Sequence, residues 1–321
     1  MERRPLGRTG VEVSRIVLGC GNFGGIGSAP ALFGRGENRD EAFALMDAAW
    51  AAGINVFDTA ASYGGGRSES WVGDWRGERG APVVLSTKVF WSVTGDPSDR
   101  GLFPDRIRRE LEGSLSRLRT QKVDMYLTHE PDEETPIAET LGALDETVRA
   151  GKVGAIGASN LDGVALAEAL ETSDRLGLTR FGWVQNEYSL LRRVVEEDVL
   201  PICEQEGLGF TPFSPLAGGW LTGKYKRGEA YPSGSRMTLR PDPYDDLVSD
   251  ATFDGLEAFA AEAAARGVAP ATLAIAWVLG HPQVTGVVVG PRSTEQLDAA
   301  LAAAELDLTR QERADLAGLF A

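Results

Sequence analysis

The sequence is poor in the residues that build metal sites and disulfide frameworks. Only two histidines and two cysteines occur among its 321 residues, and Cys20 and Cys203 both lie in apolar surroundings. Their spacing does not match a structural zinc site, so no metal is expected. Two buried thiols suit a reducing compartment better than a disulfide does, which predicts a cytoplasmic location.

Long apolar runs and an excess of positive charge are also absent. No apolar run reaches the roughly 18 residues of a membrane-spanning helix, and the start, MERRPLGRTG, lacks the apolar stretch of a signal peptide. The 32 Lys and Arg residues face 47 Asp and Glu residues, so the formal net charge is −15. This charge repels a phosphate backbone. We therefore expect no membrane and no nucleic-acid partner, and a phosphate-bearing ligand needs a local basic cluster.

What the sequence does contain is a repeated alternation of short β-branched runs and longer helical patterns. Eight runs that are apolar on both faces are predicted to be strands: 15–21, 55–60, 83–89, 123–129, 153–159, 183–188, 209–213 and 285–290. Helical patterns between them cover 40–53, 104–118, 135–152, 161–177, 195–207 and 253–267. The absence of a composition break favours one α/β domain over residues 1–321, a closed (β/α)₈ TIM barrel rather than a doubly wound sheet.

Three segments lie outside this repeat. Residues 3–14 are predicted to form a β-hairpin around Gly10 that caps the bottom of the barrel. The first βα loop, 24–38, and the stretch 223–246 are unusually long. Loops of this length in a compact domain are typically functional. Nothing in the sequence encodes an oligomeric state, and a monomer is our expectation.

Polar residues follow the carboxyl ends of the predicted strands. In a barrel these ends converge on one face, and buried polar groups are unfavourable unless a ligand or a network satisfies them. The sequence therefore predicts an active site at this mouth, built from Asn22, Asp58, Lys88, His129, Ser159, Asn160, Gln185, Ser214 and Arg292.

Four residues near consecutive strand ends are suited to proton transfer. Asp58 and Lys88 end neighbouring apolar strands, where a buried lysine needs a charged partner. An ammonium beside Tyr63 is expected to lower the pKa of its phenol from about 10, which would make it a proton donor near neutral pH. His129 could orient a substrate oxygen. Alone, each has another interpretation: a structural salt bridge, a loop aromatic or a core histidine.

The motifs around these residues resemble the aldo-keto reductase superfamily, in particular its bacterial and potassium-channel β-subunit branches. They are D-T-A-x-x-Y at 58–63, S-T-K at 86–88, L-T-H-x-P-D at 127–132, G-A-S-N at 157–160, F-S-P-L-A-G-G-x-L-T-G-K-Y at 213–225 and G-P-R-S-T-E-Q-L at 290–297. The resemblance implies a (β/α)₈ barrel that binds NADPH, with NADH as the alternative cofactor. It also implies that Asp58, Tyr63, Lys88 and His129 form the catalytic tetrad, with Tyr63 as general acid.

The same resemblance assigns the cofactor contacts. Ser159, Asn160 and Gln185 match the residues that hold the nicotinamide carboxamide, and Phe213 matches the aromatic that stacks on its ring. The matches for the pyrophosphate loop are Ser214, Leu216, Gly218 and Lys224. Those for the first loop are Asn22 and Phe23. Arg236 and Arg292 match contacts to the adenine and its 2′-phosphate, for which a bidentate guanidinium is suited. The remaining cofactor positions implied are Asp58, Gly290 and Gln296.

The chain departs from the family pattern at Ala299 and Ala300, where a Glu-Asn pair commonly contacts the adenine. Two adenine hydrogen bonds are therefore expected to be missing, which leaves the preference for NADP over NAD open.

The predicted activity is NADPH-dependent reduction of an aldehyde or ketone, with a keto-sugar or an aromatic carbonyl among the candidates. The substrate pocket is expected to contain Tyr63, His129 and Trp91, with Tyr188 and Trp220 as further candidates. A cofactor-sensing regulatory subunit and an enzyme that mainly oxidises alcohols or sugars are the alternatives. The intact tetrad, His129 included, argues against the regulatory subunit.

Overall fold

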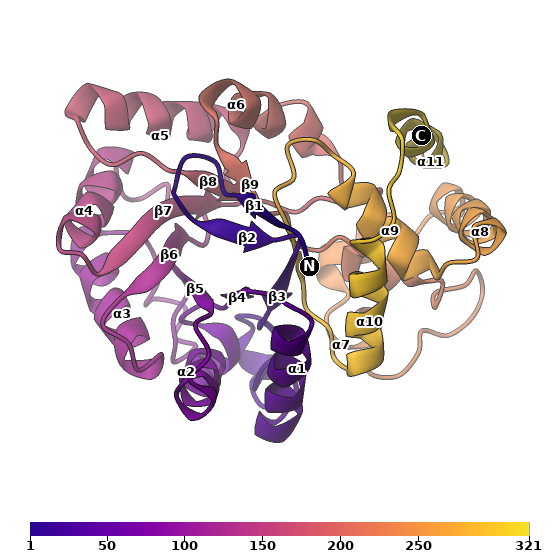
Figure 1. Ribbon diagram of the computed structural model, residues 1–321, viewed down its shortest axis with the longest axis horizontal. Helices are drawn as coiled ribbons and strands as arrows, with labels where there is room; N and C mark the ends of the chain where they lie inside the picture. Colours follow the sequence, from indigo (N-terminus) through magenta and orange to yellow (C-terminus); the bar gives the residue numbers. More distant parts are fainter. Residues whose placement is uncertain (321) are drawn as a thin grey trace.

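The computed structural model describes residues 1–320 as an eight-stranded parallel sheet with helices packed around it (Figure 1). The sheet order is β10-β3-β4-β5-β6-β7-β8-β9. The strands are β3 (Ile16–Gly19), β4 (Val56–Asp58), β5 (Val84–Val89), β6 (Val123–Thr128), β7 (Val153–Ser159), β8 (Trp183–Gln185), β9 (Gly209–Phe210) and β10 (Val287–Val289).

Backbone hydrogen bonds also join the two ends of this sheet. Thr285 N donates to Phe210 O at 2.9 Å, and Val288 N donates to Pro212 O at 2.8 Å. The sheet thus closes on itself, which confirms the predicted (β/α)₈ barrel. All eight predicted strands are present, although β3, β4, β8, β9 and β10 are clearly shorter than their apolar runs.

Most of the helices around the sheet have an amphipathic or capped sequence. The helices are α1 (Arg39–Ala51), α2 (Arg67–Arg79), α3 (Pro104–Arg117), α4 (Ile137–Arg149), α5 (Gly163–Leu176), α6 (Val199–Glu206), α7 (Arg236–Leu239), α8 (Asp250–Ala265), α9 (Pro270–Leu279), α10 (Thr294–Ala303) and α11 (Arg310–Gly318). Asn38 illustrates the capping: its side chain accepts from Asp40 N and Glu41 N, while Glu41 bonds back to Asn38 N. Within the described residues, no helix is long and apolar enough to cross a membrane.

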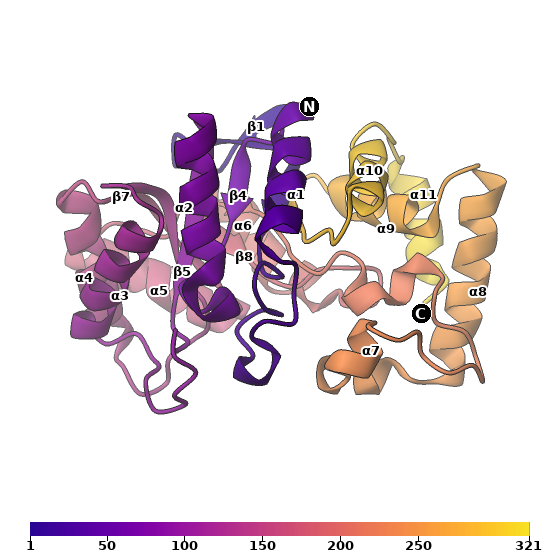
Figure 2. The same cartoon turned by 90° about the horizontal axis from the view of Figure 1, so that it is seen from below.

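A hairpin of β1 (Arg3–Pro5) and β2 (Glu12–Ser14) covers one end of the barrel, as predicted. Leu6, in its turn, is fully buried with the side chains that fill the barrel interior, among them Met125 and Trp183. Gly7 has a φ of +52°, and a Cβ there would lie 2.5 Å from Gly209 N, so the close approach requires glycine. Figure 2 shows the first long loop and α7 at the opposite end, where the strands end.

Candidate active site

The barrel brings Asp58, Tyr63, Lys88 and His129 together at the carboxyl ends of β4, β5 and β6. Asp58 is the last residue of β4, Lys88 lies one residue before the end of β5, and His129 directly follows β6. The His129 N–H extends the ladder by donating to Val89 O at 2.9 Å. Ala61 N donates to Lys88 O at 3.1 Å, which folds the segment that carries Tyr63 over β5. The parallel register of β4, β5 and β6 therefore determines where each group lies along the barrel axis.

Lys88 and Asp58 form a buried ion pair with a Nζ–Oδ2 distance of 2.5 Å, and their side chains are 1% and 4% exposed. Lys88 Nζ also donates to Thr59 O at 2.9 Å. The other carboxylate oxygen, Asp58 Oδ1, accepts from Ser86 Oγ at 2.8 Å and from Gln185 Nε2 at 3.2 Å. Burial by itself lowers the pKa of Lys88, but Asp58 and the Tyr63 phenol outweigh this effect and raise it. The ammonium is therefore held charged inside the barrel.

The Tyr63 hydroxyl faces the imidazole of His129, with an OH–Nε2 distance of 3.4 Å. The two rings meet edge to face at an interplanar angle of 78°. Lys88 Nζ lies 5.1 Å from the centre of the Tyr63 ring. Burial, followed by the Lys88 charge, places the pKa of His129 well below 6.5, so its imidazole is neutral. The phenol, imidazole and ammonium are thus gathered around one point.

The expected lowering of the Tyr63 pKa is not what the structure gives. Burial raises the pKa of the Tyr63 phenol, and the opposing effect of Lys88 is smaller. The neighbouring charge is evident from the sequence, whereas the desolvation of the phenol depends on how the chain packs around it. A phenol that keeps its proton at neutral pH is nevertheless in the form that a general acid requires.

The carboxamide-binding candidates form one connected group beside the tetrad. Ser159 pairs with Gln185 in the β7–β8 register, and its Oγ donates to Gln185 O at 2.6 Å. Asn160 has a left-handed φ of +61°, and its Nδ2 donates to His129 O at 3.0 Å. Gln185 also reaches Asp58, as described above. Two amides and a hydroxyl, able both to donate and to accept, therefore lie next to the proton-transfer groups.

The segment after β9 makes a tight, largely left-handed loop. Positive φ values occur at Ser214 (56°), Ala217 (45°), Gly218 (64°) and Gly219 (97°). A Cβ at Gly218 would lie 2.5 Å from the Tyr244 ring, so the aromatic packs directly on the backbone. Successive peptide groups in such conformations present N–H groups to an anion. The half-buried Phe213 and Leu216, the candidates for the ring and pyrophosphate contacts, lie in the same segment.

Lys224, Arg236 and Arg292 form a basic cluster beside this loop. Burial, then the charges of Arg236 and Arg292, lower the pKa of Lys224. A phosphate would relieve this repulsion between like charges, so the cluster fits a phosphate-bearing cofactor in an otherwise acidic protein. Gln296 Oε1 accepts from Arg292 N at 3.0 Å and holds the loop that carries the guanidinium.

The first-loop candidates have different environments. Asn22 lies between the other parts of the site: its Nδ2 donates to Gly290 O, and its Oδ1 accepts from Arg236 Nη2, both at 3.5 Å. The Phe23 side chain, in contrast, is only 1% exposed within the hydrophobic core. It packs against other protein side chains. The sequence could not separate these neighbours because both belong to one loop motif.

The two alanines that depart from the family pattern lie on α10 against α9. Ala300 is fully buried, and Ala299 O accepts from Thr272 Oγ1 at 3.1 Å. These positions supply no side-chain hydrogen bond to an adenine, as the sequence indicates.

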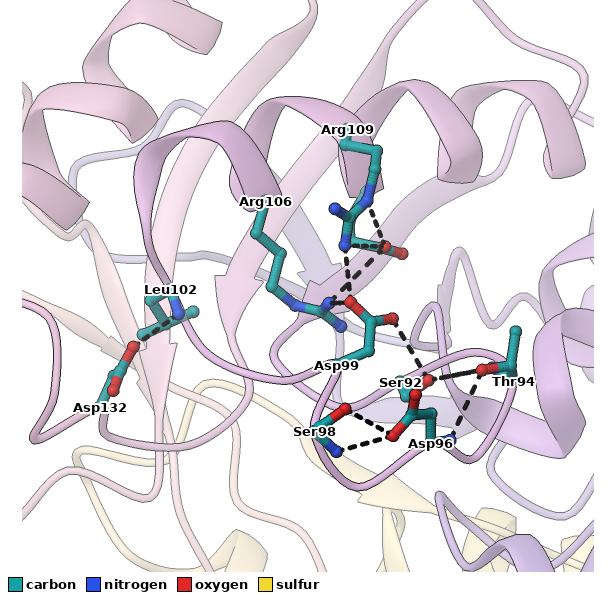
Figure 3. Close-up of polar contacts among 10 residues, drawn as sticks. Ser92, Thr94, Asp96, Ser98, Asp99, Leu102, Arg106, Arg109 and Asp132 are labelled. Atoms are coloured by element: carbon teal, nitrogen blue, oxygen red, sulfur yellow. Dashed lines mark hydrogen bonds and ion pairs between the residues drawn. The ribbon is translucent and has the colours of Figure 1, made fainter.

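Trp91 is half-buried next to Phe90, in the loop between β5 and α3. A polar network folds this loop (Figure 3). Asp99 Oδ1 accepts from Arg109 Nη2 at 2.7 Å and from the fully buried Arg106, while its Oδ2 accepts from Ser92 Oγ at 3.3 Å. The loop that carries Trp91 is thereby pinned to α3.

A contact to the next βα loop also holds the Trp91 loop in place. Leu102 N donates to Asp132 Oδ2 at 2.6 Å, which ties the Trp91 loop to the loop after His129 (Figure 3). Tyr188 and Trp220 do not line the pocket, because both side chains are fully buried. The Tyr188 hydroxyl instead donates to Glu196 Oε1 at 2.5 Å.

The contacts of two residues near the site, Tyr244 and Glu37, could not be predicted from the sequence. Tyr244 follows a Pro-rich stretch that is typical of a surface loop, yet it is buried on Gly218. Glu37 pairs with Arg292, with an Oε1–Nε distance of 2.8 Å. No local signal predicts either contact, since each joins segments that are far apart in the chain.

Comparison with known proteins agrees with this geometry. The sequence pattern of the aldo/keto reductase family matches residues 15–320. The uncharacterized oxidoreductase YrpG of Bacillus subtilis is 39% identical, over 97% of this chain and 93% of its own length. A probable voltage-gated potassium channel subunit beta of Oryza sativa is 37% identical, over 92% and 89%. The NADH-specific methylglyoxal reductase of Escherichia coli is 32% identical, over 96% and 95%. The chain therefore belongs to the aldo/keto reductase family, whose members are oxidoreductases that use nicotinamide cofactors.

Proposed function

We propose that this protein reduces an aldehyde or a ketone to the alcohol with NADPH, and that Tyr63 donates the proton. The observation that carries the proposal is the meeting of three groups at the barrel mouth. The Tyr63 hydroxyl lies 3.4 Å from His129 Nε2, and the Lys88 ammonium lies 5.1 Å from the Tyr63 ring centre. These groups are what protonation of a carbonyl oxygen requires: an acid, an orienting donor and a charge that stabilises the conjugate base.

Each member of the tetrad has a separate role in this proposal. The Tyr63 phenol is protonated at neutral pH and donates to the substrate oxygen. The Lys88 charge then stabilises the phenolate that remains, while Asp58 keeps Lys88 charged and in place. The neutral imidazole of His129 donates a hydrogen bond to the same oxygen and orients the carbonyl. Because Asp58, Lys88 and His129 are buried and Tyr63 is half-buried, their electrostatic interactions are only weakly screened by solvent.

The cofactor contacts follow the groups present at the mouth. Bound NADPH would supply the hydride. Ser159, Asn160 and Gln185 would hold its carboxamide, and Phe213 would stack on its ring. The Ser214–Gly218 backbone with Lys224 would contact the pyrophosphate. Arg236, Arg292 and the nearby Asn22, Gly290 and Gln296 would surround the adenosine end. The crowded positive charge of this cluster supports a phosphate-bearing dinucleotide.

Trp91, together with Tyr63 and His129, is proposed to line the substrate pocket. Its aromatic surface suits flat carbonyl compounds and the apolar faces of sugars. Three relatives are named as reductases: one for norsolorinic acid, one for versiconal hemiacetal acetate and one for methylglyoxal. Carbonyl substrates of this kind are therefore the first to test. We also propose that residues 1–321 work as one barrel domain and as a monomer, which size-exclusion chromatography with light scattering can check.

The plant relatives that are named as channel β subunits support a second candidate, a cofactor-sensing subunit. One experiment separates the two functions. NADPH and NADH consumption is followed with a panel of aldehydes, ketones and keto-sugars, for the wild type and for Tyr63→Phe. We expect the variant to bind cofactor normally and to lose about 10²- to 10⁴-fold in kcat.

The matched control is Tyr126→Phe, in which the buried phenol makes only a 3.5 Å contact to Ile107 O, outside the site. It should keep wild-type turnover. Near-wild-type reduction by Tyr63→Phe would remove the proton-donor assignment. Tight cofactor binding without turnover on any substrate would favour the sensing subunit instead.

A further inference from the structure

Glu37 occupies a fixed position between the first long loop and α1, next to the proposed cofactor site. Its N–H donates to Asn22 O at 2.9 Å, and its carbonyl accepts from Gly24 N at 2.9 Å. The side chain is only 3% exposed although it lies at the end of a surface loop. The carboxylate is therefore held by its backbone beside Asn22, which itself contacts Arg236.

This carboxylate engages the guanidinium that is matched to the 2′-phosphate. Glu37 Oε1 lies 2.8 Å from Arg292 Nε, and Arg292 Nη1 donates to Gly234 O at 3.1 Å. Arg292 is 42% exposed, so the guanidinium extends from the buried carboxylate toward the surface. One of the three cations of the basic cluster is thus paired with an anion inside the protein.

The second oxygen of Glu37 is unsatisfied. Among residues 1–320, Oε2 is buried and has no hydrogen-bond partner. A buried acceptor without a donor destabilises a protein, and more so when it is charged. A stabilising role for the ion pair would be better served if both oxygens were bonded. The unpaired oxygen therefore leaves uncompensated negative charge beside the proposed adenosine end of the site, where it acts on a phosphate.

We propose that Glu37 sets the preference between the two nicotinamide dinucleotides. This inference rests on the proposed cofactor site. The carboxylate competes with the 2′-phosphate of NADPH for Arg292 and repels that phosphate, which weakens NADPH binding. NADH carries a neutral hydroxyl at this position, so the Glu37 charge does not repel it. The wild-type protein therefore discriminates less between NADPH and NADH than its basic cluster alone would.

The test measures dissociation constants for NADPH and NADH, and for the fragments 2′,5′-ADP and 5′-AMP, on the whole protein by calorimetry. Glu37→Gln keeps the size of the side chain and an acceptor for Arg292 but removes the charge. We expect the preference for NADPH over NADH to rise about tenfold, which corresponds to about 1.4 kcal/mol. The fragment pair should shift in the same direction, because the effect is confined to the adenosine end.

Glu41→Gln is the matched control. It makes the same charge change one helical turn away, and glutamine keeps the capping bond to Asn38 N, which is 2.9 Å long. Its preference should stay within about twofold of the wild type, since the Glu41 carboxylate is exposed to solvent and makes no contact with Arg292. If Glu37→Gln fails to fold, Glu37→Asp withdraws the carboxylate from Arg292 and should give a smaller shift of the same sign.

The outcomes separate this inference from the proposed function. A wild-type protein that binds both dinucleotides, combined with an unchanged preference in the Glu37 variants, overturns the role of Glu37 alone. A wild type that binds neither dinucleotide overturns the proposed cofactor site and this inference with it. A shift shared by Glu41→Gln would reduce the effect to net charge and also overturn the role of Glu37.

Discussion

Replacing Lys88 with methionine tests the electrostatic part of the proposed mechanism. Methionine matches the length of the apolar stem and can occupy the same buried space. Asp58 keeps its bonds from Ser86 and Gln185. The variant removes a charge about 5 Å from the Tyr63 ring. At an effective dielectric constant of about 20, the attraction between that charge and a phenolate at about 5 Å is roughly 3 kcal/mol. The expected loss in kcat is therefore about 100-fold.

The assay is single-turnover reduction, which isolates the chemical step from product release. Lys152→Met provides the control, because that lysine is 43% exposed and pairs only with a surface carboxylate. The double variant Lys88→Met/Tyr63→Phe adds a sharper test. Without a phenolate to stabilise, the loss of Lys88 should slow Tyr63→Phe by less than about threefold.

Two results would refute the reasoning. The first is a Lys88→Met rate within about threefold of the wild type, which would mean that the ammonium does not stabilise the transition state. The second is full additivity of the two substitutions, which would mean that Lys88 acts independently of Tyr63. Cofactor affinity is measured in parallel, so that a binding defect is not mistaken for a chemical one.

Three further predictions concern stability and the substrate loop. Arg117→Met should destabilise the fold by about 3–5 kcal/mol in denaturant unfolding, because it strips the partner 2.6 Å from the fully buried Glu69; a loss under about 1 kcal/mol would contradict this. The unfolding free energy should fall as pH drops below about 6.5, since His129 then becomes protonated in the unfolded chain but not in the native state, where its pKa is lowered. His129→Gln should reduce this pH dependence, and a variant with the wild-type pH profile would contradict the prediction. Asp99→Asn should raise KM more than it lowers kcat, because it loosens the network that holds the Trp91 loop; steady-state kinetics that show the reverse would place Asp99 in the chemical step.

The sequence by itself determined the barrel and the position of the tetrad along it. Eight apolar runs, each with a polar residue within or just beyond its last residues, are a local pattern, and parallel pairing of such runs brings their ends to one face whatever the loops do. For this reason the order of the runs is enough to place Asp58, Lys88 and His129 at one mouth. The predicted helical patterns do not include α2, α9, α10 or α11. In α9 the reason is that residues 272–279 are all buried and leave no polar stripe to reveal a helical period.

Only the tertiary structure decided the features that depend on contacts between distant segments and on desolvation. Glu37 and Arg292 are separated by 255 residues, and Tyr244 reaches Gly218 by folding back from a loop with no regular pattern. The direction of the Tyr63 pKa shift reversed for a related reason. A neighbouring charge can be inferred from strand order, but the solvent excluded around a phenol depends on every element packed over it.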